Sequence, residues 1–495
     1  MGVVKRQSAK QSLLQILGIF IGGISVLYIY PLDTEMLGFA RFIWDTGILF
    51  SSVVLLGSDS GLIRFFPRMR LKSGQNFSLP FYSLLLLVGI VFFSIIYMMF
   101  GDRILTLLNK NNTEYLVYNN YFFFSIILTS IIMFLNVYCN TLKRIVVPFI
   151  ASNLIKKITL PLLILASVYG YINTLTFANM LIVTLLLAIL LQVVYIYMVT
   201  GWRLGKIDWT YIKRNWQPVF NFSFISTFGA IGSNFAFQID SFMISTLVDY
   251  NSNGIYAIAF FIANMVYIPF SALSGIMSPI LSENISSKNW PKIDEHYKQG
   301  SIIMLTIGIP IFLLGYFCIP DLQNIFPTNK DFQVLGVIVL LIGLTKLFDL
   351  ATSYNSQILL YSDLYRYNLL LTVLMAIQNI ILNYVFIVVF NMGIIGVALA
   401  STINLFIFNT AKLVLLYRKY NINPFSQATI FILMLGAFLF GLLWIVPDLS
   451  NPYLSVLVKT VFVGIIYTTF VKVFHLSPEV EKYGMELWNK FRIKL

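Results

Sequence analysis

The sequence predicts an all-α polytopic membrane protein with fourteen transmembrane helices. Of its 495 residues, 58% are hydrophobic and only 11% are charged, and the mean hydropathy is +0.84. A helix that spans a bilayer needs roughly 20 mostly apolar residues, because about 30 Å of hydrocarbon is crossed at about 1.5 Å per residue. Apolar stretches of this length follow one another along almost the whole chain. They are continuous and do not alternate over ten-residue units, which indicates helices.

The predicted spans form two sets of six and a final pair. The first set occupies about 11–30, 42–65, 80–100, 116–139, 145–168 and 174–198. The second set occupies about 219–247, 255–281, 300–319, 333–360, 366–390 and 393–416, and the last pair 427–446 and 453–474. Each range is long enough to cross the hydrocarbon core as a helix.

The loops between these spans alternate in charge. With a cytoplasmic N-terminus, almost all loop Lys and Arg residues lie inside, and the outer loops hold only Arg41, Arg103, Lys110 and Lys330. If one span were added or left out, the basic loops that follow it would move to the outer side. The observed distribution of charge therefore supports fourteen spans with both termini in the cytoplasm. The net charge of +13 follows from basic side chains beside anionic headgroups and does not indicate nucleic-acid binding.

The chain resembles itself at an offset of roughly 216 residues, the period expected of two six-span halves. "DTEMLGFARF" after the first span corresponds to "DYNSNGIYAIAF" after the seventh, so Gly38 pairs with Gly254. We expect two parallel lobes around a central substrate cavity. The expected boundaries are an N-lobe at 1–200, a cytoplasmic linker at 201–218, a C-lobe at 219–417, two further helices at 418–476 and an amphipathic cytoplasmic tail at 477–495.

Two segments carry a resemblance to a known family. They are "LLGSDSGLIRFFPRM" at 55–69 and "QIDSFMISTLVDYNSNGIYAIAFFIANMVYIPFSALSGIMSPILSEN" at 238–284, which contains Asp240, Gly254, Tyr256 and Pro279. In these segments the chain resembles the Wzx-type lipid-linked oligosaccharide flippases of the multidrug/oligosaccharidyl-lipid/polysaccharide (MOP) superfamily, which are related to MATE and MurJ transporters. The resemblance implies a MATE/MurJ-like fold of two pseudo-symmetric six-helix lobes plus two C-terminal helices. It also implies a location in the bacterial inner membrane.

Ionisable side chains at membrane depth are costly, so each one is a candidate for function. Lys156 and Lys157 lie at the midpoint of the fifth span without an acidic partner within four residues. Because neighbouring helical residues point about 100° apart, only one of them can face a given cavity squarely. Lys346 lies at the midpoint of the tenth span with Asp349 on the same helical face, as a self-neutralised structural pair or as part of an anion site.

We assign a set of cationic residues to substrate binding, as contacts of a diphosphate and its glycan: Lys156, Lys157, Lys346, Arg64 and Arg41. Arg64 is assigned either to the cavity or to the basic patch at the inner surface. Asp45, Ser52 and Asp59 follow one another at intervals of seven on the second span, which predicts one polar stripe along a helix.

Asp240 lies near the outer end of the seventh span, beside Gln238 and one helical face away from Asn234. A hydrogen-bonding role and an ion-coupling role are both open for Asp240. The predicted coupling and polar network comprises Asp240, Asp349, Asp45, Asp59, Gln238 and Asn234.

Other function classes are disfavoured. The two cysteines and two histidines do not have the spacing of zinc ligands, so we expect neither a metal nor a cofactor. A membrane glycan polymerase would need a large outer loop for its catalytic groups, and the longest predicted outer loop has about 16 residues. We therefore expect a protein that is not an enzyme.

The leading hypothesis is a flippase that moves polyprenyl-diphosphate-linked oligosaccharide from the inner to the outer leaflet by alternating access. It would serve the biosynthesis of a surface polysaccharide, such as the O-antigen of lipopolysaccharide or a capsule. Cationic side chains at mid-depth would offset the desolvation of the diphosphate. The expected partners are this substrate, the bilayer and the polymerase or glycosyltransferases of the pathway. The alternative is a MATE-like multidrug or cation antiporter, which would favour a cavity rich in carboxylates.

Overall fold

The computed structural model describes residues 2–69, 76–108, 118–201, 205–325, 332–446 and 449–474. These residues are almost entirely helical and include no β-strand, which confirms the predicted all-α class. In this part of the chain, twelve helical segments are long and apolar enough to cross a membrane. The other two predicted spans are also helices, one at Trp209–Leu247 and a shorter apolar one at Gln427–Leu443. The predicted tail at 477–495 lies outside the described residues.

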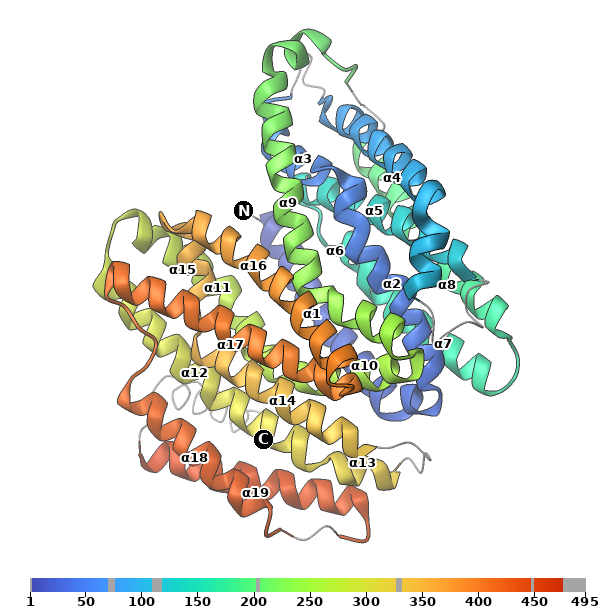
Figure 1. Cartoon of the computed structure of the whole chain (residues 1–495). Coiled ribbons are helices and arrows are strands. Elements are labelled where there is room, and N and C mark those ends of the chain that lie inside the picture. Colours follow the sequence, from blue (N-terminus) through green and yellow to red (C-terminus); the bar gives the residue numbers. More distant parts are fainter. Residues whose placement is uncertain are drawn as a thin grey trace. The chain divides into compact units, whose positions relative to one another are not determined.

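The chain divides into two compact units, residues 1–257 with 383–394, and residues 258–382 with 395–495. The helices of the first unit are coloured blue to green in Figure 1, except the segment 383–394, which is orange. Their bounds are α1 (Gly2–Ile24), η1 (Ser25–Ile29), η2 (Tyr30–Leu32), α2 (Thr34–Leu55), α3 (Ser58–Phe65), α4 (Ser78–Leu108), α5 (Asn119–Thr141), α6 (Val146–Phe149), η4 (Ile150–Leu154), α7 (Ile155–Val168), α8 (Thr174–Thr200), α9 (Trp209–Leu247), the beginning of α10 (Tyr250–Asn264) and η6 (Val385–Val389).

Helix α2 is the centre of the first unit and packs against α4, α5 and α9. Most of its residues are buried, whereas α4 presents Leu87, Val91 and Met98 to the outside. Large exposed apolar side chains on a helix of this length are expected where the helix faces lipid. The buried side of α4 joins α2, α3, α5 and α9 in one apolar core that includes Leu62, Phe93 and Phe134.

The second predicted span, 42–65, is not one helix. Leu56 and Gly57 both adopt left-handed backbone conformations, with φ of 47° and 70°, which ends α2 and starts α3 in a new direction. The predicted stripe of Asp45, Ser52 and Asp59 is therefore interrupted, because Asp59 belongs to a separate helix. The sequence contains Gly57 at this point, but a single glycine does not by itself end a helix.

A close contact joins α2 to the beginning of α10. A Cβ atom on Gly38 would lie 1.7 Å from Tyr250 O, and one on Gly254 would lie 1.9 Å from Thr34 O. Asn253 Nδ2 donates to Gly38 O at 3.1 Å. Gly38 and Gly254 are the residues that the internal repeat pairs, and each contacts the residue four positions before its counterpart. The contact is therefore reciprocal, as a two-fold relation between the repeats requires.

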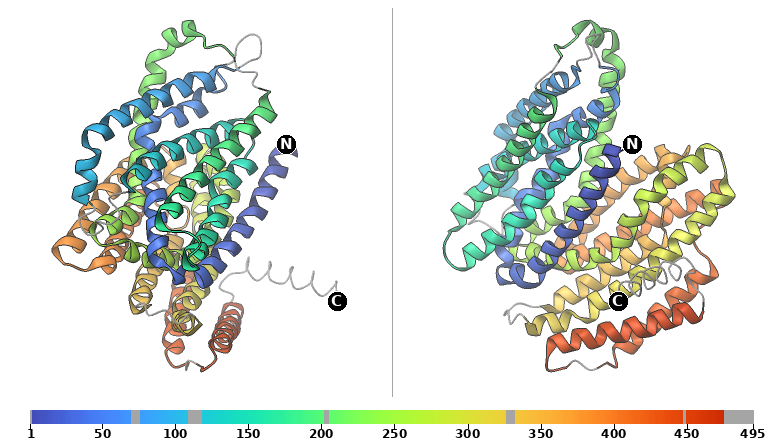
Figure 2. Two further views of the ribbon diagram at one scale, coloured as in Figure 1. Left: turned by 90° about the vertical axis from the view of Figure 1, so that its right-hand side faces the viewer. Right: turned by 180° about the vertical axis from the view of Figure 1, so that it is seen from behind.

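The helices of the second unit lie along the rest of the chain. Their bounds are the end of α10, η5 (Met265–Tyr267), α11 (Ile268–Ser286), α12 (Trp290–Phe317), α13 (Ile319–Ile325), α14 (Phe332–Ala351), α15 (Asn355–Tyr361), α16 (Tyr365–Tyr384), α17 (Gly393–Tyr420), α18 (Gln427–Leu443) and α19 (Pro452–Val473). Helix α12 is central and packs against α11, α14, α18 and α19. Figure 2 shows the red α18 and α19 side by side in this unit.

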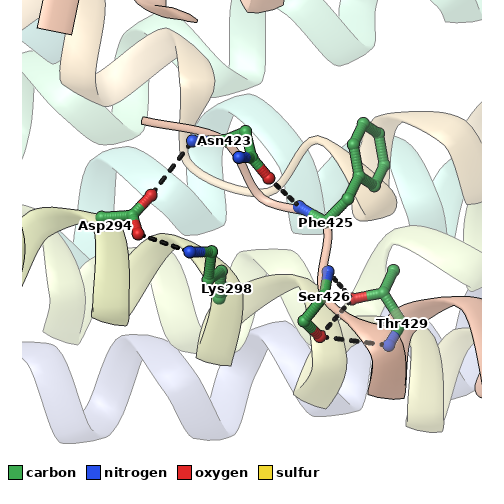
Figure 3. A network of polar contacts seen from close by, with 6 residues as sticks. All are labelled: Asp294, Lys298, Asn423, Phe425, Ser426 and Thr429. Carbon is green, nitrogen blue, oxygen red and sulfur yellow. Dashed lines mark hydrogen bonds and ion pairs between the residues drawn. The ribbon is translucent and has the colours of Figure 1, made fainter. Parts of the chain in front are cut away.

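The entry into α18 is fixed by the polar network of Figure 3. Asp294 of α12 accepts hydrogen bonds from Lys298 Nζ and, at 3.0 Å, from the backbone N–H of Asn423. Ser426 and Thr429 form a reciprocal capping box at the first turn of α18. These bonds hold the beginning of α18 against α12.

Candidate functional site

A first cationic cluster in the first unit consists of Arg41, Asp45 and Lys156. Arg41 Nε lies 3.1 Å from Asp45 Oδ2, one turn along α2. Lys156, at the beginning of α7, interacts electrostatically with Asp45 and places its Nζ 5.1 Å from the ring centroid of Trp44. Two cations thus share one carboxylate, and the cluster has an excess of positive charge.

The surroundings of this cluster favour an anion. The Asp45 side chain is only 6% exposed, whereas that of Arg41 is 38% exposed, so the guanidinium is the more accessible member of the pair. The buried indole Nε1–H of Trp44 has no hydrogen-bond partner among the described residues. A buried donor without a partner is costly, and an anion beside the two cations would satisfy it.

The neighbouring Lys157 has a different environment. Its Nζ donates to the backbone carbonyl of Gly18 on α1 at 3.2 Å. The two adjacent lysines therefore diverge, as the helical geometry predicts. Lys157 links α7 to α1, and Lys156 joins the cationic cluster.

Asp240 lies in a separate polar network of the first unit. Its Oδ2 accepts from the Tyr256 hydroxyl at 3.0 Å, and its Oδ1 accepts from Asn383 Nδ2 at 2.8 Å. Asp240 thus connects α9, α10 and the end of α16. Asn383 is fully buried and Asp240 is half-buried, and both of these hydrogen-bond donors to the carboxylate are neutral.

The donors of these two hydrogen bonds to Asp240 are Tyr256 and Asn383, and not the predicted neighbours Asn234 and Gln238. Asn234 Nδ2 donates to Ile48 O at 2.9 Å and lies 3.2 Å from Ser52 Oγ, so it fastens α9 to α2. Gln238 is half-buried on the same helix. Polar contacts of this kind commonly hold membrane helices together.

Asp59 and Arg64 lie on α3 and outside the cationic cluster. Asp59 Oδ1 accepts from the backbone N–H of Ser60 at 2.7 Å, at the first turn of α3. Arg64 is exposed, and its guanidinium carbon lies 4.2 Å from the ring centroid of Phe222 on α9. The break at Leu56–Gly57 separates both residues from the polar groups of α2.

A second cationic cluster, in the second unit, consists of Lys346, Asp349 and Lys412. Lys346 Nζ lies 5.1 Å from the ring centroid of Tyr267 and 5.7 Å from that of Phe260. Both lysines interact electrostatically with Asp349, yet neither forms an ion pair within 4.0 Å among the described residues. This cluster again contains two cations and one carboxylate.

Hydrogen bonds fix the members of the second cluster in place. Asp349 accepts from the Tyr267 hydroxyl and, at 3.0 Å, from Asn409 Nδ2. Asn409 in turn accepts from Asn355 Nδ2 at 3.1 Å. Lys412, only 2% exposed, donates to Ser356 Oγ at 2.7 Å. Asp349 thus has two neutral donors, and among the described residues it forms no ion pair within 4.0 Å with Lys346.

The position of Lys346 also differs from the prediction. Helix α14 ends at Ala351, and Ser353 has a left-handed φ of 46° before α15 begins. The predicted span 333–360 is therefore two helices, and Lys346 lies near the end of the first rather than at the midpoint of one.

Two buried lysines were not among the predicted site residues. Lys412 belongs to the second cluster, and Lys459 of α19 pairs with Asp321 of α13 at 2.7 Å and donates to Phe317 O at 2.9 Å. Both lie within predicted spans, so the rule that flagged Lys156 and Lys346 would have found them. The structure is needed to show that Lys459 has an ion-pair partner, Asp321, whereas Lys412 forms no ion pair within 4.0 Å among the described residues.

The described residues contain no group of three or more His, Cys, Asp and Glu side chains placed to hold a metal ion. Two clusters in the membrane-spanning helices instead each contain two basic side chains and one carboxylate. Such sites can bind and release an anion by electrostatic attraction alone.

The comparisons with known proteins agree with this architecture. A family model described as MatE matches residues 226–385. The lipid II flippase MurJ, in an inward closed conformation, has a TM-score of 0.67 and 18% identity over 94% of this chain and 99% of the MurJ chain. An inward-facing multidrug resistance MATE family transporter of the MOP superfamily has a TM-score of 0.58 and 14% identity over 82% of this chain and 94% of that one. A search of curated protein sequences gives no significant match. The chain therefore has a multi-pass membrane fold similar to the folds of the flippase MurJ and a MATE transporter.

Proposed function

We propose that this protein is a flippase that moves a polyprenyl-diphosphate-linked oligosaccharide across the membrane, for the biosynthesis of a surface polysaccharide such as O-antigen or capsule. The observation that carries the proposal is the same in both units. Each unit contains one cluster of two basic side chains and one carboxylate, namely Arg41, Lys156 and Asp45 in one and Lys346, Lys412 and Asp349 in the other.

The charge excess matches the chemistry of the cargo. Charged side chains in a membrane span are expensive unless a partner offsets them. A diphosphate carries negative charge on each phosphate, so it can offer a partner to each cluster at successive stages of transport. Trp44 adds an unused N–H donor to the first cluster, and the aromatic rings beside Lys156 and Lys346 stabilise the cations while the site is empty.

Asp240 is the proposed coupling residue. Its carboxylate has two neutral donors, Tyr256 and Asn383, and all three residues lie within the MatE match. A carboxylate in such surroundings can take up a proton or a sodium ion and exchange it during the cycle. Asp240→Asn tests this role, because transport by the variant should lose its dependence on pH or sodium.

A MATE-like multidrug or cation antiporter is the second candidate. The MatE match over 226–385 favours it, and so does the half-buried Asp240 carboxylate. The excess of cations in both clusters opposes it, because a cationic drug would be repelled there.

The setting of the proposed function follows from the sequence. We propose that the protein lies in the bacterial inner membrane with both termini in the cytoplasm, since the loop charges favour that orientation. Glycosyltransferases would then supply its cargo, and polysaccharide polymerases would consume it.

The proposal is tested with purified protein in liposomes that contain a fluorescent polyprenyl-diphosphate oligosaccharide. Movement between leaflets is followed by the access of an added glycosidase to the glycan. Lys156→Gln and Lys346→Gln should each slow transport by about tenfold or more, the effect of losing a charge-assisted hydrogen bond.

Lys157→Gln is the matched control, because its ammonium is bound to Gly18 O on the neighbouring helix. It should transport at a rate close to that of the unchanged protein. The proposal is wrong if both cluster variants transport normally, or if the unchanged protein exports ethidium and leaves the glycolipid in place.

A further inference from the structure

A chain of hydrogen bonds in the second unit leads from the ammonium of Lys412 to the carboxylate of Asp349. Lys412 Nζ donates to Ser356 Oγ at 2.7 Å, and Ser356 Oγ donates to Asn355 Oδ1 at 3.2 Å. Asn355 Nδ2 donates to Asn409 Oδ1 at 3.1 Å, and Asn409 Nδ2 donates to Asp349 Oδ1 at 3.0 Å. Every bond in this chain therefore has its donor on the side of the lysine and its acceptor on the side of the aspartate.

The two ends of the chain fix this direction. An ammonium group has only donors, and an ionised carboxylate has only acceptors. Asn409 must therefore turn its NH2 group toward Asp349, which leaves its carbonyl oxygen for Asn355. Hydrogen bonds that all point one way polarise one another, so the chain is strongest while its two ends are charged. Asn355, Asn409 and Lys412 are at most 2% exposed, which shields these bonds from water.

The break between α14 and α15 makes this chain possible. Asn355 follows Asp349 by six residues. On one continuous helix their side chains would point about 240° apart and lie about 9 Å apart along the axis, so that one amide would not contact both. Because Ser353 has a left-handed φ of 46°, α15 starts as a separate helix at Asn355, and the Asn409 amide of α17 contacts both residues. This amide pair, Asn355 and Asn409, connects α15 to α17.

The direction of the Asp349 carboxylate decides which lysine it neutralises. Lys346 lies three residues before Asp349 on α14, a spacing at which helical side chains can pair. The carboxylate instead accepts from Asn409 and from the Tyr267 hydroxyl, and Lys346 forms no ion pair within 4.0 Å among the described residues. The negative charge is thus connected by hydrogen bonds to the more deeply buried Lys412. Lys346, which is half-buried, lies beside the ring of Tyr267 at 5.1 Å.

We propose that the amide pair has a positioning role: it holds the Asp349 carboxylate away from Lys346 and so leaves this cation free to bind the cargo. This inference rests on the proposed function, and it names the residues that decide which lysine of the second cluster meets the diphosphate. Without the Asn409 donor, the carboxylate would be free to turn toward the ammonium one helical turn away. Its other donor, Tyr267, already lies beside Lys346 and would not prevent this turn. A carboxylate on the same helix is always close by, so it would compete with the diphosphate for Lys346.

Asn409→Leu tests this role, because leucine has as many side-chain heavy atoms as asparagine and cannot donate a hydrogen bond. In the liposome assay with the fluorescent glycolipid, this variant should slow transport about fivefold or more, approaching the effect of Lys346→Gln. Adding Asp349→Asn removes the competing carboxylate and should bring transport back to within about twofold of the unchanged protein. If the amides only supported the fold, a second polar change in the same core would add to the damage and would not reverse it.

Asn404→Leu is the matched control on the same helix. Asn404 is also 1% exposed, but its Nδ2 donates to the backbone carbonyl of Met375, at 3.1 Å, and not to a carboxylate. This control should transport at close to the unchanged rate, and adding Asp349→Asn to it should not raise that rate. Asn355→Leu is a second variant of the amide pair. It keeps the Asn409 donor and removes only its support, so it should slow transport about threefold, with recovery when Asp349→Asn is added.

The crystal structure of the Asn409→Leu protein gives a measurement that needs neither cargo nor transport. It should show an ion pair between Lys346 and Asp349, which is absent from the described residues of the unchanged protein. Asn355→Leu gives the same readings if Asn409→Leu does not fold.

Three results would each overturn the inference: normal transport by the amide-pair variants, no recovery with Asp349→Asn, or an Asp349 carboxylate that stays apart from Lys346 in the variant structure. A different result would reject the proposed function alone. If the new ion pair forms, but the unchanged protein does not move the glycolipid or moves it equally well as Lys346→Gln, the control of Asp349 by the amide pair stands without that function.

Discussion

The substitution Gly38→Ala tests the reciprocal contact between α2 and α10. The new Cβ would lie 1.7 Å from Tyr250 O. An ordinary contact requires about 3.4 Å, so the two helices would have to move apart by roughly 1.7 Å. Gly254→Ala creates the corresponding overlap with Thr34 O at 1.9 Å.

Three energies decide the outcome for Gly38→Ala. Overpacking costs about 1–3 kcal/mol, and here the overlap is with backbone, which cannot rotate away. Parting the helices also weakens the bond from Asn253 Nδ2 to Gly38 O, worth about 0.5–1.5 kcal/mol. Alanine regains up to about 1 kcal/mol of helix propensity. The net expected loss is about 2–3 kcal/mol.

The assay is thermal unfolding of the purified protein in detergent, read by the loss of helical circular dichroism. Gly464→Ala on α19 is the control, because a Cβ there meets nothing within 4 Å. It should melt at the same temperature as the unchanged protein or slightly higher. The double variant Gly38→Ala with Gly254→Ala should lose less than the sum of the single losses, because the first substitution already separates the helices. Single variants that melt normally would refute the reciprocal contact.

Three further outcomes follow from the structure. Lys459→Met leaves Asp321 buried without its cation and should destabilise the protein by about 3–5 kcal/mol, whereas Lys459→Met with Asp321→Leu should recover most of this loss in the same melting assay. Lys412→Met should reduce glycolipid transport in liposomes about tenfold while membrane insertion stays normal, and unchanged transport would remove Lys412 from the second cluster. Ser426→Ala removes the cap of α18 and should cost about 1 kcal/mol, seen as faster hydrogen exchange at the first turn of α18; equal exchange would contradict the capping role.

Hydropathy was sufficient to predict the helical membrane fold, because the cost of exposing polar backbone to lipid leaves few alternatives. It could not place the ends of helices within an apolar run. Leu56 and Ser353 end helices through backbone conformations that are uncommon for residues other than glycine, and apolar residues resume after both, at Leu62 and Ile358.

The candidate site was predictable in part. The rule that buried charge is costly identified Lys156, Lys346 and Asp349, but it could not supply the partners of each group. Whether Lys157 contacts Gly18 O and whether Lys459 contacts Asp321 depends on helices distant in the sequence. The predicted pairing of Gly38 with Gly254 came from sequence similarity, and the structure brings these two residues into contact.

The central claim is that the cation-rich clusters bind the negative charge of the cargo. The most direct measurement compares the rates at which the protein in liposomes moves one oligosaccharide on two lipids, polyprenyl diphosphate and an uncharged prenyl glycoside. The account predicts rapid movement of the diphosphate form, little movement of the neutral form, and loss of this preference in Lys156→Gln and Lys346→Gln. Equal rates for the two lipids in the unchanged protein would contradict it.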